Sequence, residues 1–155
     1  MQPDATLHFS VTVSDLDRSI AWYEEALGLA VVARQRNENA YTRAIVGFED
    51  AVLEIAFLEL PGPAPVRLEL IEYVRPRGEA VALPTNLPGV AHIAFRVADI
   101  DAALTRVAAA GGSPVNPPVE IDRGVNRGMR ACYLRDPDGF TIELMQPPPA
   151  ADSPG

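Results

Sequence analysis

The chain has 155 residues, of which 48% are apolar and 22% charged, and its 13 basic and 21 acidic side chains give a net charge of −8. A chain of this size and apolar content can bury a core without cross-links, and its acidity disfavours nucleic acid and anionic membrane surfaces as partners. All basic residues are arginines and Cys132 is the single cysteine, which excludes lysine chemistry, an intrachain disulfide and a cysteine-built zinc site. With no signal-peptide pattern over Met1–Thr6 and no apolar run of about 20 residues, we expect a cytoplasmic protein that acts on a small molecule.

The first predicted elements are a strand and a helix within residues 7–28. The strand shows the two-residue period of a half-buried strand, with apolar residues at Phe9, Val11 and Val13. Ser14 or Asp15 is a capping residue for the helix that follows, and Gly28 is the residue type that ends one. The helix places its apolar stripe on one side, at Ile20, Tyr23, Ala26 and Leu27.

Two further strands are predicted in the first half of the chain, at Ala51–Leu60 and Val66–Tyr73. The turn residues Pro61-Gly62-Pro63 separate them. Tyr41 and Arg43 fall in the segment between the helix and these strands, where periodicity is weak.

Residues 91–112 repeat residues 7–28 at a fixed offset of 84. The identical pairs include His8 and His92, Val13 and Val97, Asp15 and Asp99, Asp17 and Asp101, and Gly28 and Gly112. The second half therefore predicts the same strand and helix, the helix capped at Asp99 and ended by Gly111–Gly112. Strands at Met129–Arg135 and Phe140–Gln146 follow, joined by the turn Asp136-Pro137-Asp138-Gly139.

These elements predict an α+β fold of two βαβββ modules, forming a cupped, mostly antiparallel sheet with helices on its outer face. Module one spans about 5–75, a linker about 76–89, and module two about 90–147, followed by a Pro-rich tail at 148–155. The whole chain, 1–155, is expected to be one domain.

Strand parity points to a metal site. His8 and His92 are the only histidines and occupy equivalent places, and Glu69 and Glu143 alternate with apolar residues on the last strand of each half. In a cupped sheet all four side chains would enter the concavity. Two imidazoles and two carboxylates suit a divalent metal, with ligand charges of −2 against +2. A single such histidine or strand glutamate is more typical of a solvated surface, so the joint pattern carries the prediction.

The segments LHFSVTVSDLDRSIAWYEEALGL, VRLELIEY, VAHIAFRVADIDAAL and YLRDPDGFTIELMQ resemble the vicinal oxygen chelate superfamily, the glyoxalase, bleomycin-resistance and dioxygenase group. The resemblance covers about Leu7 to Gln146 and implies paired βαβββ modules. Members commonly place metal ligands on the first and last strands of each module, and the matching positions are His8, Glu69, His92 and Glu143.

The ligand set narrows the function that this resemblance implies. The chain keeps a fourth ligand candidate, and in this it is similar to glyoxalase I and methylmalonyl-CoA epimerase-like members. This similarity favours an isomerase, lyase or epimerase that removes a proton next to a carbonyl through a metal-stabilised enediolate. The cofactor is then one zinc, nickel, cobalt, manganese or iron ion. An extradiol-type dioxygenase and an antibiotic-binding resistance protein without catalysis are the alternatives. The expected substrate is a small carbonyl acid or thioester, and a homodimer is expected by analogy.

Several residues are candidates for the remaining roles. The base is Glu143 or Glu69, or else Glu54, which an exposed strand position would explain equally well. The candidates for contact with anionic parts of a substrate are Arg67, Tyr73, Arg96 and Arg43, since arginine binds carboxylates bidentately. Arg67 and Arg96 have the alternative of balancing nearby carboxylates. Residues 123–130 form either a lid or a hairpin loop.

Overall fold

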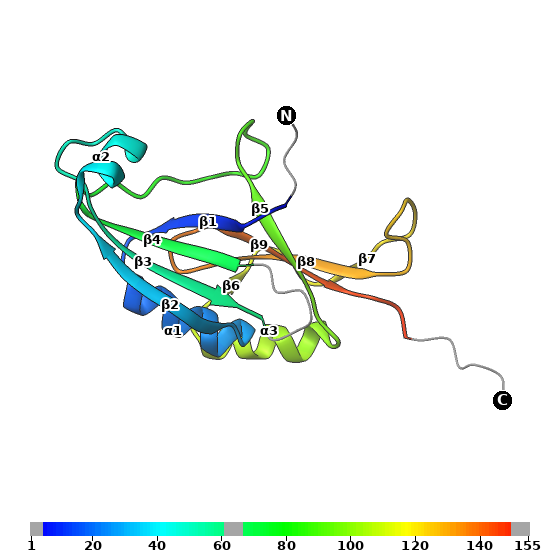
Figure 1. Cartoon of the computed structure of the whole chain (residues 1–155). Coiled ribbons are helices and arrows are strands. Elements are labelled where there is room, and N and C mark those ends of the chain that lie inside the picture. The colour runs from blue at the N-terminus through cyan, green and yellow to red at the C-terminus, as the bar shows by residue number, and fades with distance from the viewer. Residues whose placement is uncertain (1–4, 61–66, 150–155) are drawn as a thin grey trace. The chain divides into compact units, whose positions relative to one another are not determined.

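The computed structural model describes residues 5–60 and 67–149, which form two compact units, Met1–Ala82 and Leu83–Gly155. The boundary between the units falls inside the predicted linker. The predicted turn at Pro61–Pro63, the predicted strand start at Val66, and residues 150–155 of the predicted tail lie outside the described residues. Each unit holds one sheet with a long helix against it (Figure 1).

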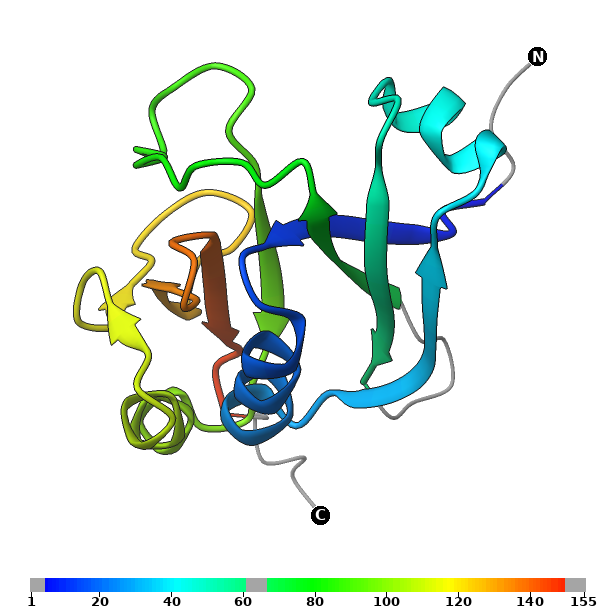
Figure 2. The same cartoon turned by 90° about the vertical axis from the view of Figure 1, so that its left-hand side faces the viewer.

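The first unit confirms the predicted βαβββ order and adds one short helix. Its elements are β1 (His8–Val13), α1 (Leu16–Leu27), β2 (Ala30–Asn37), α2 (Ala40–Val46), β3 (Val52–Glu59) and β4 (Arg67–Arg75). The strands lie in the order β1-β4-β3-β2, with β1 parallel to β4 and the other pairs antiparallel. Figure 2 shows α1 end-on beneath one face of this sheet.

Local residue chemistry fixes both ends of the helices in this unit. Asp15, rather than Ser14, is the N-cap of α1, and its carboxylate accepts from the Arg18 N–H. Gly28 ends α1 with a φ of 71°, a left-handed conformation that favours glycine. Asn39 caps α2 in the same way, by accepting from the Thr42 N–H.

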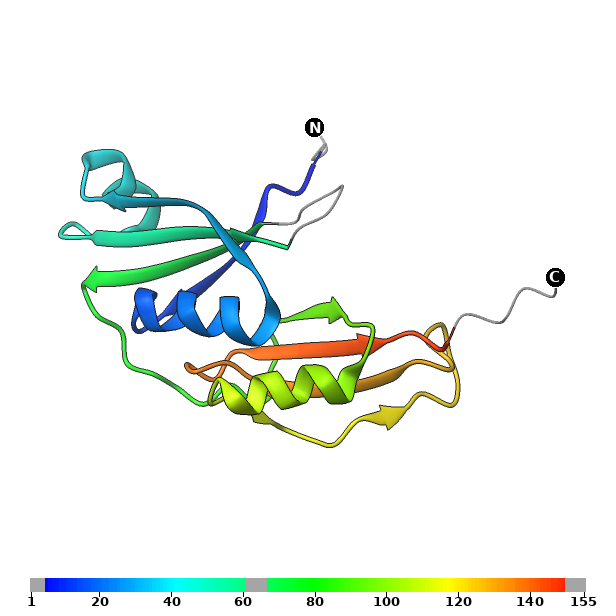
Figure 3. The same cartoon turned by 90° about the horizontal axis from the view of Figure 1, so that it is seen from below.

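The second unit repeats the plan with a broken edge. Its elements are β5 (His92–Arg96), α3 (Ile100–Ala109), β6 (Ser113–Pro114), β7 (Val119–Glu120), β8 (Arg130–Arg135) and β9 (Thr141–Gln146). The order is β5-β9-β8-β6, β7 also pairs with β8, and β5 is parallel to β9. Asp99 caps α3 as predicted, and Gly111, with a φ of 80°, follows the end of the helix. Figure 3 shows α3 lying along β9.

The backbone geometry of the turn before β9 requires particular residue types at two of its positions. The Asp136 carboxylate accepts from the N–H groups of Asp138 and Phe140 at 2.9 and 2.8 Å. Gly139 adopts a φ of 86° and donates its N–H to the Asp136 carbonyl. Aspartate and glycine at these two positions therefore fix where β9 begins and which of its side chains face each side.

Each sheet has a helix face, which packs against α1 or α3, and an opposite face that we call the His face. Leu70 and Leu144 lie on the helix faces and are 0% exposed. Glu69 and Glu143 precede them in the strands and point the other way, as do His8 and His92 by their register. The predicted parity of these four side chains is confirmed within each module. No helix in the part of the chain that the structure describes is long and apolar enough to cross a membrane.

Candidate functional site

The first module brings together His8, Glu69 and Phe57 on its His face. The parallel pairing of β1 with β4 places Ser10, two residues after His8, beside Glu69. The His8 Nε2 and Glu69 Oε2 atoms lie 3.4 Å apart, with the side chains 40% and 12% exposed. Phe57, directly opposite Glu69 on β3, meets the imidazole edge-on at 5.9 Å between ring centroids.

The second module repeats this arrangement with His92, Glu143 and Tyr133. The His92 Nε2 and Glu143 Oε2 atoms also lie 3.4 Å apart, and the side chains are 43% and 19% exposed. Tyr133 is directly opposite Glu143 on β8, and its ring lies 5.4 Å from the imidazole at a tilt of 50°. Each module thus holds one imidazole and one carboxylate against an aromatic ring.

The donor chemistry of each pair fits a divalent metal of borderline softness, which accepts imidazole nitrogen and carboxylate oxygen. Both side chains of each pair are partly exposed on the same face. No group of three or more histidine, cysteine, aspartate or glutamate side chains suited to a metal occurs in residues 5–60 and 67–149. Each module by itself therefore offers two ligands, whereas a tetrahedral or catalytic zinc site takes three or four from the protein.

The arginine and tyrosine candidates lie in different surroundings. The strand register places three of them, Arg67, Tyr73 and Arg96, on the His faces. Arg67 Nε donates to Glu59 Oε1 and lies beside an open cavity of about 410 Å³. The cavity is lined by Thr6, Leu7, His8, Phe57, Glu59 and Arg67.

Tyr73 and Arg43 have contacts of their own within the first unit. The Tyr73 ring packs edge-on against Phe48 at 6.0 Å. Arg43, on α2, donates from Nη2 to the Glu38 carbonyl at 3.0 Å, and Tyr41 on the same helix is 61% exposed. These contacts support the segment around α2.

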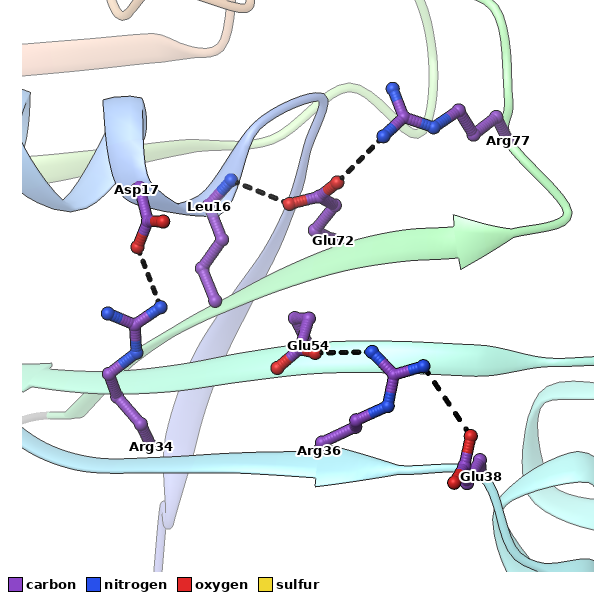
Figure 4. A network of polar contacts seen from close by, with 8 residues as sticks. All are labelled: Leu16, Asp17, Arg34, Arg36, Glu38, Glu54, Glu72 and Arg77. Atoms are coloured by element: carbon purple, nitrogen blue, oxygen red, sulfur yellow. Dashed lines mark hydrogen bonds and ion pairs between the residues drawn. The ribbon is translucent and has the colours of Figure 1, made fainter.

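Glu54 does not join the His8 and Glu69 cluster. It lies opposite Glu72 in the register of β3 with β4, and Glu72 accepts from the Leu16 N–H at the start of α1, so both are on the helix face. The Glu54 Oε1 atom accepts from Arg36 Nη1 at 2.7 Å (Figure 4). The carboxylate is thus engaged in a polar network on the side of the sheet away from His8.

Residues 123–130 belong to the hairpin connection between β7 and β8. The Ile121 N–H donates to the Met129 carbonyl, and the Gly128 N–H donates to the Ile121 carbonyl, both at 2.8 Å. Of the two predictions for this segment, the hairpin loop is the one that these bonds support.

Phe57 and Tyr133 are contacts of the histidines that the sequence analysis missed. Each lies on the strand before a glutamate-bearing strand, directly opposite that glutamate. Counting back across the Asp136–Gly139 turn would have found Tyr133. More residues separate β3 from β4 than separate β8 from β9, so the same count does not find Phe57.

Comparisons with known proteins agree with this fold. The chain is 30% identical over 145 residues to a probable lactoylglutathione lyase of Vibrio cholerae, covering 90% of this chain and 88% of that one. It is 34% identical over 152 residues to a 2-epi-5-epi-valiolone epimerase of an Actinomyces species, covering 95% and 81%. A crystal structure of a glyoxalase family protein from Bacillus cereus matches with a TM-score of 0.83 and 26% identity, covering 94% and 95%.

A family model describes nearly the whole two-module plan. It matches residues 6–144, which include all four histidine and glutamate side chains of the two pairs. The repeated strand and helix, the turn before β9 and the relatives at about 30% identity all agree with that match. The chain therefore belongs to the glyoxalase/bleomycin resistance protein/dioxygenase superfamily.

Proposed function

We propose that this protein is a divalent-metal-dependent lyase, isomerase or epimerase that removes a proton next to a substrate carbonyl. The observation that carries the proposal is the matched pair of imidazole and carboxylate, 3.4 Å apart in each module. Relatives named as a lyase and an epimerase support the same class of reaction.

His8 and Glu69 of one module, with His92 and Glu143 of another, would hold the metal. The two modules could belong to one chain or to two chains of a homodimer, and the proposal covers both arrangements. We also propose that the protein is a homodimer and that it is cytoplasmic. A divalent ion bound there supplies Lewis-acid stabilisation of negative charge on substrate oxygens. Zinc, nickel, cobalt, manganese and iron all accept this donor set.

The chain's own groups supply the proton transfer and the orientation of the substrate. Glu143 or Glu69 accepts the proton from the carbon next to the carbonyl, because each is a carboxylate fixed on a strand and directed to the His face. Arg67 and Arg96, on the same faces, hold anionic parts of a small carbonyl acid or thioester.

The first test combines metal analysis with isotope exchange. Protein purified without chelator should contain a divalent metal, and His8→Ala should lower that metal content. In D₂O, metal-loaded protein should exchange the proton next to the carbonyl in a panel of small carbonyl acids and acyl thioesters, read by NMR, and chelation should stop the exchange.

Two results would overturn the proposal in favour of its alternatives. Oxygen uptake by Fe(II)-loaded protein across a panel of catechols would identify a dioxygenase. Tight binding of a hydrophobic antibiotic that is independent of metal, with no exchange in any panel member, would identify a binding protein.

A further inference from the structure

One difference between the His8–Glu69 pair and the His92–Glu143 pair is the aromatic ring beside the histidine. Phe57 and Tyr133 occupy the same place, opposite the glutamate of their module, and both rings contact the imidazole. The rings differ by a single hydroxyl group. The module with His8 therefore presents a hydrocarbon ring where the module with His92 presents a phenol.

The Tyr133 hydroxyl is available for an external partner. The backbone of Tyr133 is fixed by a hydrogen bond, in which the Tyr133 N–H donates to Asn116 Oδ1 at 3.0 Å. Among the residues whose placement is described, no group forms a hydrogen bond with the hydroxyl itself. The Tyr133 side chain is half-buried, and its hydroxyl is not among the described buried polar atoms that lack a partner, so the hydroxyl is open to an atom of a bound substrate while the ring stays packed against His92.

The Phe57 side has a different character. Phe57 and Leu7 contribute apolar walls to the cavity of about 410 Å³ beside His8. The charged groups there, Arg67 and Glu59, form an ion pair with each other. The Phe57 side therefore suits an apolar substituent of the substrate. It has no ring hydroxyl that could donate a hydrogen bond to a substrate oxygen beside His8.

We propose that the Tyr133 hydroxyl donates a hydrogen bond to the substrate oxygen that gains negative charge, and that the Phe57 position has no such role. This inference rests on the proposed function and makes it more specific, because it selects substrates with a developing oxygen anion next to the reacting carbon. A hydroxyl directed at such an oxygen stabilises the charged state more than the neutral substrate.

The test uses acetohydroxamic acid, a planar chelator whose two adjacent oxygens resemble those of the negatively charged enediolate. Wild type, Tyr133→Phe and Phe57→Tyr are loaded with zinc, and zinc and hydroxamate affinities are measured separately by calorimetry. Tyr133→Phe should weaken hydroxamate binding about tenfold, the effect of losing one hydrogen bond to a charged group. Its zinc affinity should be unchanged, because the ring that packs against His92 is kept. Phe57→Tyr, the matched control, should not weaken the hydroxamate.

The outcomes separate the two proposals. If wild type binds zinc and hydroxamate and Tyr133→Phe binds both equally well, Tyr133 only packs against His92 and the inference is overturned. A parallel loss of zinc affinity in Tyr133→Phe would also overturn it, by showing a structural role. If wild type binds no zinc, the proposed function fails and this inference fails with it. With a substrate that the enzyme converts, Tyr133→Phe should lower kcat and leave KM nearly unchanged.

Discussion

The two modules keep the same centre and differ at the edge of the sheet. In the first, β2 runs for eight residues beside β3, whereas in the second the equivalent edge is reduced to β6 and β7, of two residues each. Pro114, Pro117 and Pro118 lie in or between these two short strands, and proline has no N–H to donate to a ladder. The strands that carry the histidine and glutamate are intact in both modules, so the difference between the modules is confined to the sheet edge away from these residues.

In both modules the glutamate-bearing strand also bonds to the start of the helix. Glu72 Oε2 accepts from the Leu16 N–H, and Gln146 Oε1 accepts from the Ile100 N–H, both at 2.9 Å. Each acceptor stands three residues after the glutamate of the pair. The strand that positions the carboxylate therefore also holds the first turn of the helix, in one module with a charged group and in the other with a neutral amide.

The largest expected effect separates the two carboxylates. Glu143→Gln should lower turnover about 100-fold or more, because an amide cannot accept the proton. Glu69→Gln should cost less turnover if Glu143 is the base. Steady-state kinetics with metal content measured in parallel tests this, and equal losses in both variants would show that the two modules share the proton transfer.

The next effect compares the two cores. Leu70→Ala and Leu144→Ala each remove a side chain that is 0% exposed, so each should lower the free energy of unfolding by about 2–5 kcal/mol. Urea titration followed by circular dichroism measures it. Val32→Ala, at a residue 48% exposed on the edge strand, is the control and should change stability by less than about 0.5 kcal/mol.

Exchanging the two helix-holding side chains tests the role of charge. Glu72→Gln should lower stability by about 0.3–1 kcal/mol, because a carboxylate is favoured over an amide near a helix N-terminus. Gln146→Glu should change stability in the opposite direction, aided by Arg130 beside it in the sheet. Thermal unfolding at low and high salt checks both, and differences that persist undiminished at high salt would argue against a charge effect.

The last prediction concerns Cys132, which stands where the first module has Ala56, opposite the buried leucine of the last strand. Burial raises the pKa of the Cys132 thiol, so less thiolate is present near neutral pH than in an exposed cysteine. A thiol reagent should react slowly with folded protein, faster as the pH rises towards that pKa, and fastest in denaturant. Cys132→Ala should cost only about 1 kcal/mol, and rapid labelling of the folded wild type would contradict the burial.

The sequence alone determined the parts of the molecule that obey local rules. Strand alternation assigned His8, Glu69, His92 and Glu143 to one face of each sheet, because successive side chains of a strand point in opposite directions. Capping chemistry located the starts of α1 and α3, since Asp15 and Asp99 satisfy N–H groups only a few residues away. The repeat then predicted that both halves share one plan, which the structure confirms.

Tertiary structure decided which face of β3 meets the helix. Alternation along the strand places Glu54 on the side opposite Phe57, but β3 is a central strand with buried apolar residues on both faces. Its own pattern therefore carries no sign of which side is inward. Pairing with β4 put Glu54 among the helix-side network and brought Phe57 to His8, as pairing of β8 with β9 brought Tyr133 to His92. Contacts between strands distant in sequence depend on register, and register is set by the packed sheet rather than by any one segment.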